Sequence, residues 1–127
     1  MPMRLTHTCL ITPDVRRLRD FYAKALRMRP SNDSEAYVEF TVGDTILSLW
    51  DLAGHLKQAP GTAEARANRS LIVEFQVDDV DAEFERMRGL GAEIAKAVTT
   101  QEWGNRSFYF RDPDGNLVNF FSRVQKA

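Results

Sequence analysis

The first residues whose types and spacing could support chemistry are His7 and Cys9. They are two positions apart, so in a β-strand their side chains lie on the same face. An imidazole beside a thiol can activate it as a nucleophile, and the pair can also bind a soft metal ion. Because nothing orients a third partner, two ordinary roles compete with this hypothesis. Cys9 is then a small core residue, and His7 a hydrogen-bonding residue in a ligand cavity.

Glu74 is a candidate general base. It follows Ile72 by two positions in a strand-forming segment, so the two side chains share a face. If that face lines a cavity, burial raises the pKa of the carboxyl group and equips it to take a proton from a substrate. The competing interpretation is an exposed carboxylate that pairs with an arginine.

Three aromatic residues could form the walls of a cavity for a planar ligand. Trp50 shares a strand face with Ser48, Trp103 precedes a glycine in a loop, and Phe121 closes the last apolar run. Large aromatic side chains supply much of the contact area in small-molecule sites. Trp50 fits an ordinary place in the hydrophobic core equally well.

Composition bounds the classes of protein to which this chain can belong. Its 127 residues suit one domain, and its 43% hydrophobic content suffices for a packed core. A net charge of −1 gives no electrostatic case for binding nucleic acid or an anionic membrane. A single cysteine allows no disulfide within the chain, the N-terminus lacks the apolar segment of a signal peptide, and no apolar run approaches the roughly 20 residues that span a bilayer. We therefore expect a cytoplasmic protein.

The periodicity of apolar residues predicts alternating strands and helices. Strand patterns cover residues 4–11, 36–42, 45–50 and 71–77, and helical patterns cover residues 15–26 and about 79–90. Residues 30–34 are expected to form a loop, and residues 51–70 a polar connection with a short helix near 63–67. Residues 93–98 are expected to form an irregular or edge strand.

Residues 102–121 predict a β-hairpin with a tight turn at Asp112-Pro113-Asp114-Gly115. Proline fixes the second position of the turn, and glycine accepts the positive φ that follows. The side chain of Asp112 can hydrogen-bond to the backbone of its own turn. Asn119 is the exception in this hairpin, because it is an amide in an otherwise apolar strand.

The chain also repeats itself. Asp14-Val15 corresponds to Asp79-Val80, both at helix starts, and residues 46–50 correspond to residues 117–121. This alignment makes His7 equivalent to Ile72, and Ser48 equivalent to Asn119. The period predicts one domain over 1–127 built from two pseudo-symmetric modules, about 1–60 and 68–127. We expect the four equivalent positions to converge about the pseudo-symmetry axis.

Several of these motifs together resemble one superfamily. They are Thr6-His7-Thr8, Asp20-Phe21-Tyr22, the segment 76–82, and above all the turn segment 108–116. With them the chain resembles the vicinal oxygen chelate superfamily, which includes glyoxalase I, bleomycin-resistance proteins and extradiol dioxygenases. The resemblance implies an α+β fold of two βαβββ modules whose sheets curl into a cup that holds the ligand. It also implies a homodimer, with or without exchange of modules between protomers.

Metal-dependent members of that superfamily place one ligand, typically His or Glu, at each of the four equivalent positions. Here only His7 matches, because Ser48, Ile72 and Asn119 stand at the other three. An alkyl side chain cannot coordinate a metal ion, and a neutral amide oxygen is a poor ligand for zinc, nickel or iron. We therefore expect no cofactor, and a divalent metal is the less favoured alternative.

Two functional hypotheses remain open at this stage. The first is a bleomycin-resistance-like protein that binds a small aromatic or polar ligand in the cup without a full metal site. The second is an enzyme, either a metal-dependent lyase or dioxygenase with non-standard ligands or a metal-free acid-base catalyst using Glu74 and His7. The candidate ligand-binding residues are His7, Cys9, Ser48, Trp50, Ile72, Glu74, Trp103, Asn119 and Phe121.

Overall fold

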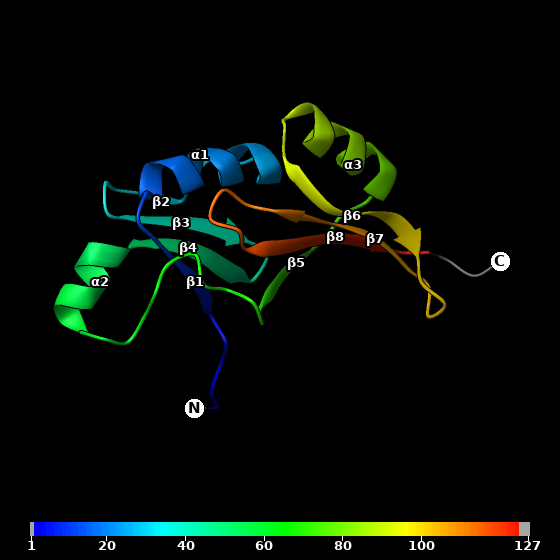
Figure 1. Ribbon diagram of the computed structural model, residues 1–127. Coiled ribbons are helices and arrows are strands. Elements are labelled where there is room, and N and C mark those ends of the chain that lie inside the picture. The colour runs from blue at the N-terminus through cyan, green and yellow to red at the C-terminus, as the bar shows by residue number, and fades with distance from the viewer. Residues whose placement is uncertain (1, 125–127) are drawn as a thin grey trace. The chain divides into compact units, whose positions relative to one another are not determined.

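The computed structural model describes residues 2–124, which form two compact units. The N-terminal unit is Met1–Ala67 and the C-terminal unit is Asn68–Ala127. Each unit contains one four-stranded mixed sheet and one longer helix that lies against a face of its own sheet (Figure 1). The α+β fold of two βαβββ modules that the sequence predicts is confirmed.

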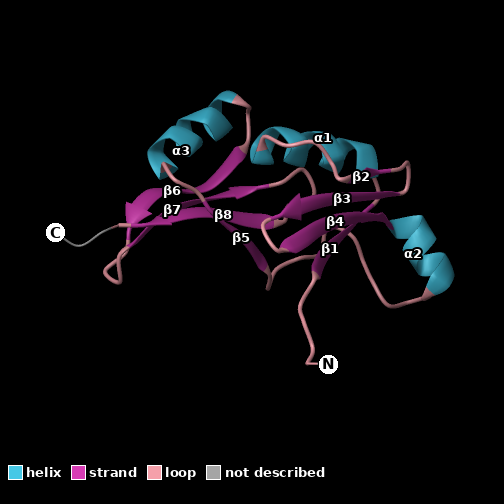
Figure 2. Cartoon of the chain, turned by 180° about the vertical axis from the view of Figure 1, so that it is seen from behind, coloured by secondary structure: helices cyan, strands magenta, loops and turns pink. Residues whose placement is uncertain are grey.

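The two units share one topology. The N-terminal unit comprises β1 (His7–Thr12), α1 (Val15–Leu26), β2 (Asn32–Asp33), β3 (Tyr37–Val42), β4 (Thr45–Asp51) and α2 (Leu52–Gln58). The C-terminal unit comprises β5 (Ile72–Gln76), α3 (Val80–Gly89), β6 (Glu93–Thr100), β7 (Asn105–Arg111) and β8 (Leu117–Arg123). The strand orders are β1-β4-β3-β2 and β5-β8-β7-β6, as Figure 2 shows. In each sheet the first strand runs parallel to the last, and the other pairs are antiparallel.

Both longer helices begin at the aspartates that the repeat predicts. The carboxylate of Asp14 accepts a hydrogen bond from the backbone N–H of Arg17 at 3.1 Å, and Asp79 does the same for Ala82 at 3.1 Å. A side-chain acceptor at this position satisfies one of the N–H groups that a helix start leaves unpaired. The N-caps therefore fix equivalent helix starts in the two units.

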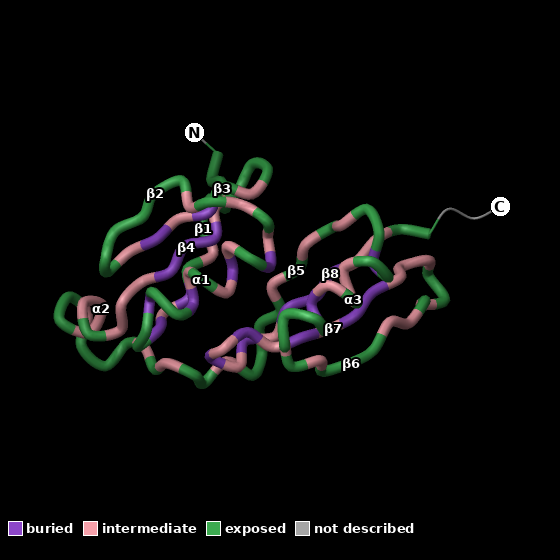
Figure 3. Tube along the Cα trace, turned by 90° about the horizontal axis from the view of Figure 1, so that it is seen from above, coloured by how far each residue is buried: buried purple, intermediate pink, exposed green. Residues whose placement is uncertain are grey.

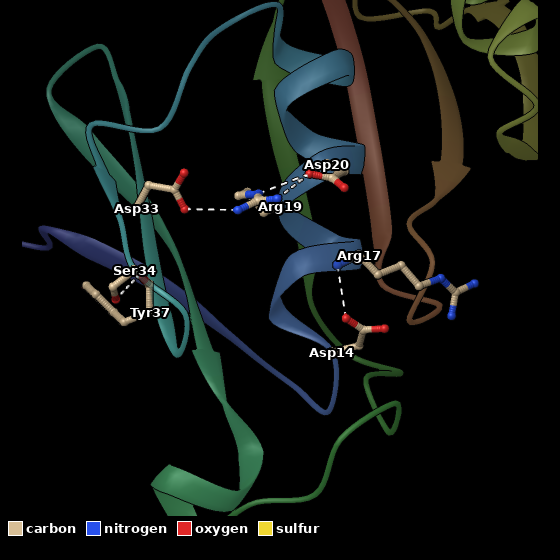
Figure 4. Close-up of polar contacts among 7 residues, drawn as sticks. All are labelled: Asp14, Arg17, Arg19, Asp20, Asp33, Ser34 and Tyr37. Atoms are coloured by element: carbon tan, nitrogen blue, oxygen red, sulfur yellow. Dashed lines mark hydrogen bonds and ion pairs between the residues drawn. The ribbon is translucent and has the colours of Figure 1, made fainter.

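A cluster of charged side chains joins α1 to the short strand β2. Arg19, half-buried on α1, forms ion pairs with Asp20 at 2.9 Å and with Asp33 at 3.3 Å (Figure 4). The hydroxyl of Ser34 donates to the carbonyl oxygen of Tyr37 at 2.8 Å, which closes the turn between β2 and β3. These contacts hold the loop that leads into β3.

Alternate residues of the strands form the core of each unit. The buried positions run along the strands and the facing stripe of the helix (Figure 3). Full burial of one large apolar side chain stabilises a fold by roughly 1.5–3 kcal/mol. The buried apolar residues are Leu10, Val15, Leu18, Tyr22, Ala25, Val38, Phe40, Leu47 and Leu49 in the N-terminal unit, and Val80, Met87, Phe108, Phe110, Val118 and Phe120 in the C-terminal unit.

The hairpin turn of the C-terminal unit forms as the sequence predicts. Gly115 has a φ of 86°, and its N–H donates to the carbonyl oxygen of Asp112 at 2.9 Å. The carboxylate of Asp112 is buried and accepts hydrogen bonds from the N–H of Asp114 and from both the N–H and the amide of Asn116, all at 2.8–2.9 Å. One side chain thus organises the whole turn.

The structure corrects the sequence prediction in several connecting segments. The helix of the connection is α2, at Leu52–Gln58, and not near residues 63–67, where Arg66 has a φ of 59°. Asp51 begins α2 by accepting the N–H of Gly54 at 3.0 Å, a capping signal that the sequence analysis overlooked. The predicted loop at 30–34 contains β2, and β1 begins at His7 because its first partner on β4 is Ile46.

β6 lies at the edge of its sheet, as expected, with two irregularities in its register. None of the helices in residues 2–124 has the length and apolar character that crossing a membrane requires.

Candidate functional site

The face of β1 that carries His7 and Cys9 is opposite the core. Leu10 and Thr12 are buried, whereas His7 and Cys9 are exposed. The prediction that Cys9 is a small core residue is therefore wrong. The reason is that side chains alternate along a strand, and the even-numbered residues of β1 occupy the side that packs on α1.

The register of the sheet defines what surrounds these two residues. Ser48 on the central strand β4 is the neighbour of Cys9 on β1 and of Glu39 on β3. In the next row, Trp50 is the neighbour of Tyr37 on β3. We call this side of the sheet, with His7, Cys9, Ser48 and Trp50 and with Tyr37 and Glu39, the N-terminal open face.

The N-terminal open face carries a shallow pocket, open to solvent, of about 410 Å³. The rings of Tyr37 and Trp50 meet edge to face along one side, with centroids 6.1 Å apart and planes at 74°. The pocket is lined by His7, Cys9, Tyr37, Ser48 and Trp50. The structure thus brings together four of the predicted candidates, and Trp50 lies half-buried in the pocket wall.

A chain of hydrogen bonds crosses this face. His7 Nε2 lies 3.3 Å from Glu39 Oε2, and the hydroxyl of Tyr37 donates to the same carboxylate oxygen at 2.6 Å. At the other ring nitrogen, Nδ1 of His7 lies 2.8 Å from the hydroxyl of Thr6. All three contacts are satisfied when the Tyr37 hydroxyl and the Nε2–H of His7 donate to Glu39 and one proton is shared between the Thr6 hydroxyl and Nδ1 of His7.

The contact between His7 and Glu39 spans the central strand. The two residues belong to β1 and β3, which are separated by β4. Ser48 of β4 is 1% exposed and lies between its register partners, Cys9 on β1 and Glu39 on β3. Its short hydroxyl-bearing side chain leaves room for the longer side chains of both neighbouring strands to meet above it.

Tyr37 is held as a neutral hydrogen-bond donor. Burial raises the pKa of the Tyr37 phenol, and the hydrogen bond to the Glu39 carboxylate raises it further. The phenol therefore stays protonated at neutral pH and fixes one oxygen of Glu39.

Tyr37 and Glu39 are functional candidates that the sequence analysis missed. Glu39 stands between the buried residues Val38 and Phe40, so it is a carboxylate on the open side of an apolar strand. Glu74 drew attention because it shares a strand face with Ile72, whereas Glu39 shares its face with no position that the repeat singled out. The signal was present in the sequence, but only the strand order shows that Glu39 reaches His7.

In the C-terminal unit, Glu74 and Asn119 form a pair. They are register partners on β5 and β8, and Nδ2 of Asn119 donates to Oε1 of Glu74 at 3.0 Å. Asn119 is 4% exposed, and its Oδ1 has no hydrogen-bond partner among residues 2–124. Glu74 itself is exposed, so the burial on which its role as a general base depends is missing, and its hydrogen-bond partner is an amide instead of an arginine.

The other predicted candidates also lie in the C-terminal unit. Ile72 at the start of β5 is 42% exposed, Trp103 is 72% exposed, and Phe121 is half-buried opposite Ser107. Trp103 borders a separate hollow with Gly104, Asn105, Arg123 and Val124. The residues that line the N-terminal pocket all belong to the N-terminal unit.

The four positions at which metal-dependent relatives place ligands do not supply a fitting donor set. They offer one imidazole, one buried hydroxyl, one alkyl chain and one amide, and both nitrogens of His7 already have polar contacts. Within residues 2–124, no group of three or more His, Cys, Asp or Glu side chains is arranged to hold a metal ion. Structural and catalytic transition-metal sites commonly use three or four such side chains.

Comparison with known proteins settles the family. The sequence profile of the Glyoxalase/Bleomycin resistance protein/Dioxygenase superfamily matches residues 4–120. The chain belongs to this superfamily. Its paired βαβββ units and the turn at Asp112–Gly115 agree with the resemblance seen in the sequence.

The proteins that are similar to this chain differ in how much of their length the similarity covers. The uncharacterized protein YraH of Bacillus subtilis is 29% identical over 129 residues, which cover 96% of this chain and 100% of YraH. Metapyrocatechase 2 of Cupriavidus necator is 33% identical over 98% of this chain, but the match covers only 38% of that protein. A superfamily member from Nocardioides is similar in structure, with a TM-score of 0.79, 26% identity, and coverage of 100% of this chain and 87% of that one.

Proposed function

We propose that this superfamily member binds a small planar aromatic compound in the pocket of the N-terminal open face. One observation carries the proposal: a pocket of about 410 Å³ is bordered by an edge-to-face Tyr37–Trp50 pair above a small, buried Ser48. The volume lies within the range of about 300–1,000 Å³ that is usual for small-molecule sites. A planar ligand gains dispersion and quadrupole contacts from such ring pairs.

The test follows the indole N–H of Trp50 by NMR while benzamide, a neutral planar probe, is added. The chain has two tryptophans, so Trp103→Phe assigns the Trp50 signal. We expect the Trp50 signal to shift and saturate. Calorimetry of Trp50→Ala is expected to show benzamide binding weakened about tenfold, since aromatic stacking contributes roughly 1–3 kcal/mol.

Leu90→Ala serves as the control. Leu90 is a 47% exposed apolar residue at the end of α3, remote in sequence from the strands of the pocket. Its removal is expected to leave the affinity unchanged. A benzamide titration that shifts only Trp103, or neither tryptophan, contradicts the proposal.

We further propose that binding needs no divalent metal. The donor chemistry at the four equivalent positions supports this, because only His7 is a strong ligand type. Metal analysis of protein purified without chelator tests it. A stoichiometric metal that is lost in His7→Ala contradicts the proposal and favours the metal-dependent enzyme instead.

The assembly that we propose is a homodimer in the cytoplasm. The edge strand β5 begins at Ile72, next to Leu71, and both side chains are more than two-fifths exposed. Exposed apolar residues on an edge strand favour association between copies of the chain. The cytoplasm is proposed because the exposed thiol of Cys9 suits a reducing compartment. Analytical ultracentrifugation of the wild type and of Ile72→Lys tests the dimer. A monomeric wild type contradicts it, and exchange of modules between protomers is a separate outcome that a crystal structure distinguishes.

A further inference from the structure

One carboxylate adjoins the residues that line the N-terminal pocket. The five lining residues provide an imidazole, a thiol, a phenol, a hydroxyl and an indole, and no lysine or arginine is among them. The group with a full negative charge next to them is Glu39, whose carboxylate contacts both His7 and Tyr37. The electrostatic character of the pocket therefore depends on Glu39.

Within the described part of the chain, the hydrogen bonds to the Glu39 carboxylate all reach one oxygen. Oε2 accepts from the Tyr37 hydroxyl at 2.6 Å and lies 3.3 Å from Nε2 of His7. Among residues 2–124, no group donates to Oε1. The carboxylate is thus held in place from one side, by contacts with two pocket residues, and its second oxygen is left to accept a hydrogen bond from a ligand.

The aromatic wall beside this carboxylate also favours positive charge. Trp50 and Tyr37 present π-systems, and the face of an indole or phenol ring attracts a cation within about 6 Å of its centre. An anionic ligand would instead face the Glu39 carboxylate without a compensating cation among the lining residues. The aromatic wall and the carboxylate therefore select the same kind of ligand.

We propose that the pocket selects planar aromatic compounds that carry a cationic N–H group, such as an amidinium, and that Oε1 of Glu39 accepts a hydrogen bond from that group. This inference rests on the proposed function and adds the chemical class of the ligand. Glu39 is its specificity-determining residue, and Tyr37 and His7 position the carboxylate.

Three probes of nearly equal size test the inference: benzamidine is cationic, benzamide is neutral and benzoate is anionic. Each is titrated in the Trp103→Phe background and followed through the Trp50 indole N–H. We expect benzamidine to bind about tenfold or more tightly than benzamide, as a charge-assisted hydrogen bond typically contributes. Benzoate is expected to bind more weakly than benzamide.

Glu39→Gln removes the charge while it keeps the shape of the side chain. In this variant we expect benzamidine and benzamide to bind equally, with the affinity for benzamide retained. Glu64→Gln is the matched control, since Glu64 is an exposed carboxylate in the segment between α2 and β5 and, unlike Glu39, makes no hydrogen bond to a residue of the pocket. It is expected to keep the preference of the wild type.

A second measurement guards against a folding defect in Glu39→Gln. In the wild type, salt is expected to weaken benzamidine binding and to leave benzamide binding unchanged, because ions screen the contact between charges. Equal affinity of benzamidine and benzamide for the wild type overturns this inference and leaves the aromatic pocket standing. If neither probe shifts Trp50, the proposed function falls together with the inference.

Discussion

The two units share one fold, but the equivalent faces of their sheets carry different side chains. Equivalent register positions carry Cys9, Ser48 and Glu39 on β1, β4 and β3, and Glu74, Asn119 and Tyr109 on β5, β8 and β7. In the N-terminal unit the carboxylate lies on the third strand and reaches over a serine to His7. In the C-terminal unit it lies on the edge strand and binds the neighbouring amide.

The residue on the central strand explains much of this difference. A serine leaves space above β4, and the pocket occupies part of that space. On β8 the longer Asn119 stands at the same position and is engaged with Glu74. The two modules thus keep equivalent cores, while substitutions on the central strand and on both of its neighbours place the polar contact across the sheet in one unit and beside the central strand in the other.

The largest losses of stability are expected from mutations in the hydrophobic cores, which the two units build in the same way. Phe40 and Phe110 occupy equivalent register positions, opposite Leu47 and Val118, and both are fully buried. Each mutation to alanine is expected to lower the free energy of unfolding by about 3–5 kcal/mol, since it removes a buried ring and leaves a cavity. Denaturant unfolding measures this. A cost below about 1 kcal/mol for either variant would show that the two cores are not equivalent.

The hairpin turns provide the next comparison. Asp112→Ala leaves the buried turn of the C-terminal unit without the acceptor of the Asp114 and Asn116 N–H groups, and is expected to cost about 1–3 kcal/mol. Asp44, the exposed residue in the matching turn of the N-terminal unit, follows Gly43, whose φ of 57° suits this turn. Asp44→Ala is expected to change stability by less than about 0.5 kcal/mol, measured in the same way. Equal losses of stability in the two variants would refute the view that Asp112 organises its turn while Asp44 does not.

Ser48→Asn places the residue of the C-terminal unit into the N-terminal one. The longer amide is expected to fill the space above β4 that Ser48 leaves and to weaken benzamide binding by about tenfold, or roughly 1.4 kcal/mol. Calorimetry measures this, with Thr45→Asn, an exposed change at the start of β4 on the opposite face of the sheet, as the control. Unchanged binding would mean that the size of the central residue does not set the pocket.

The smallest expected effect concerns the protonation of Tyr37. Because burial and Glu39 raise the pKa of this phenol, the folded protein favours the neutral form. Stability is therefore complete below the ordinary value of about 10 and is lost as the pH rises toward the higher pKa of the folded state. Tyr37→Phe is expected to cost about 1 kcal/mol at neutral pH and to lack the alkaline loss that Tyr37 causes. Thermal melts across alkaline pH test it, and an identical alkaline loss in both proteins would refute it.

Local signals in the sequence were sufficient for the framework of each unit. The capping aspartates Asp14 and Asp79, the helical stripes and the turn at Asp112 each act within a few residues, so their effects follow from spacing alone. The internal repeat then supplied the equivalent positions. The short helix α2 was missed because Gly54 interrupts its pattern, although Asp51 caps it.

The site was less accessible to sequence reasoning. The contact between His7 and Glu39 joins residues 32 positions apart on strands that are not adjacent in the sheet. Periodicity shows which residues of a strand share a face, but not the order in which the strands lie in the sheet. Periodicity also does not show which face of a strand packs on the helix, so the core and a ligand cavity both stayed open for Cys9.

A crystal structure of the protein with benzamidine tests the central claim most directly. The account predicts the ring between Tyr37 and Trp50, with the amidinium within hydrogen-bonding distance of Oε1 of Glu39. A benzamidine bound beside Trp103, or bound in the N-terminal pocket with its amidinium directed away from Glu39, would contradict it.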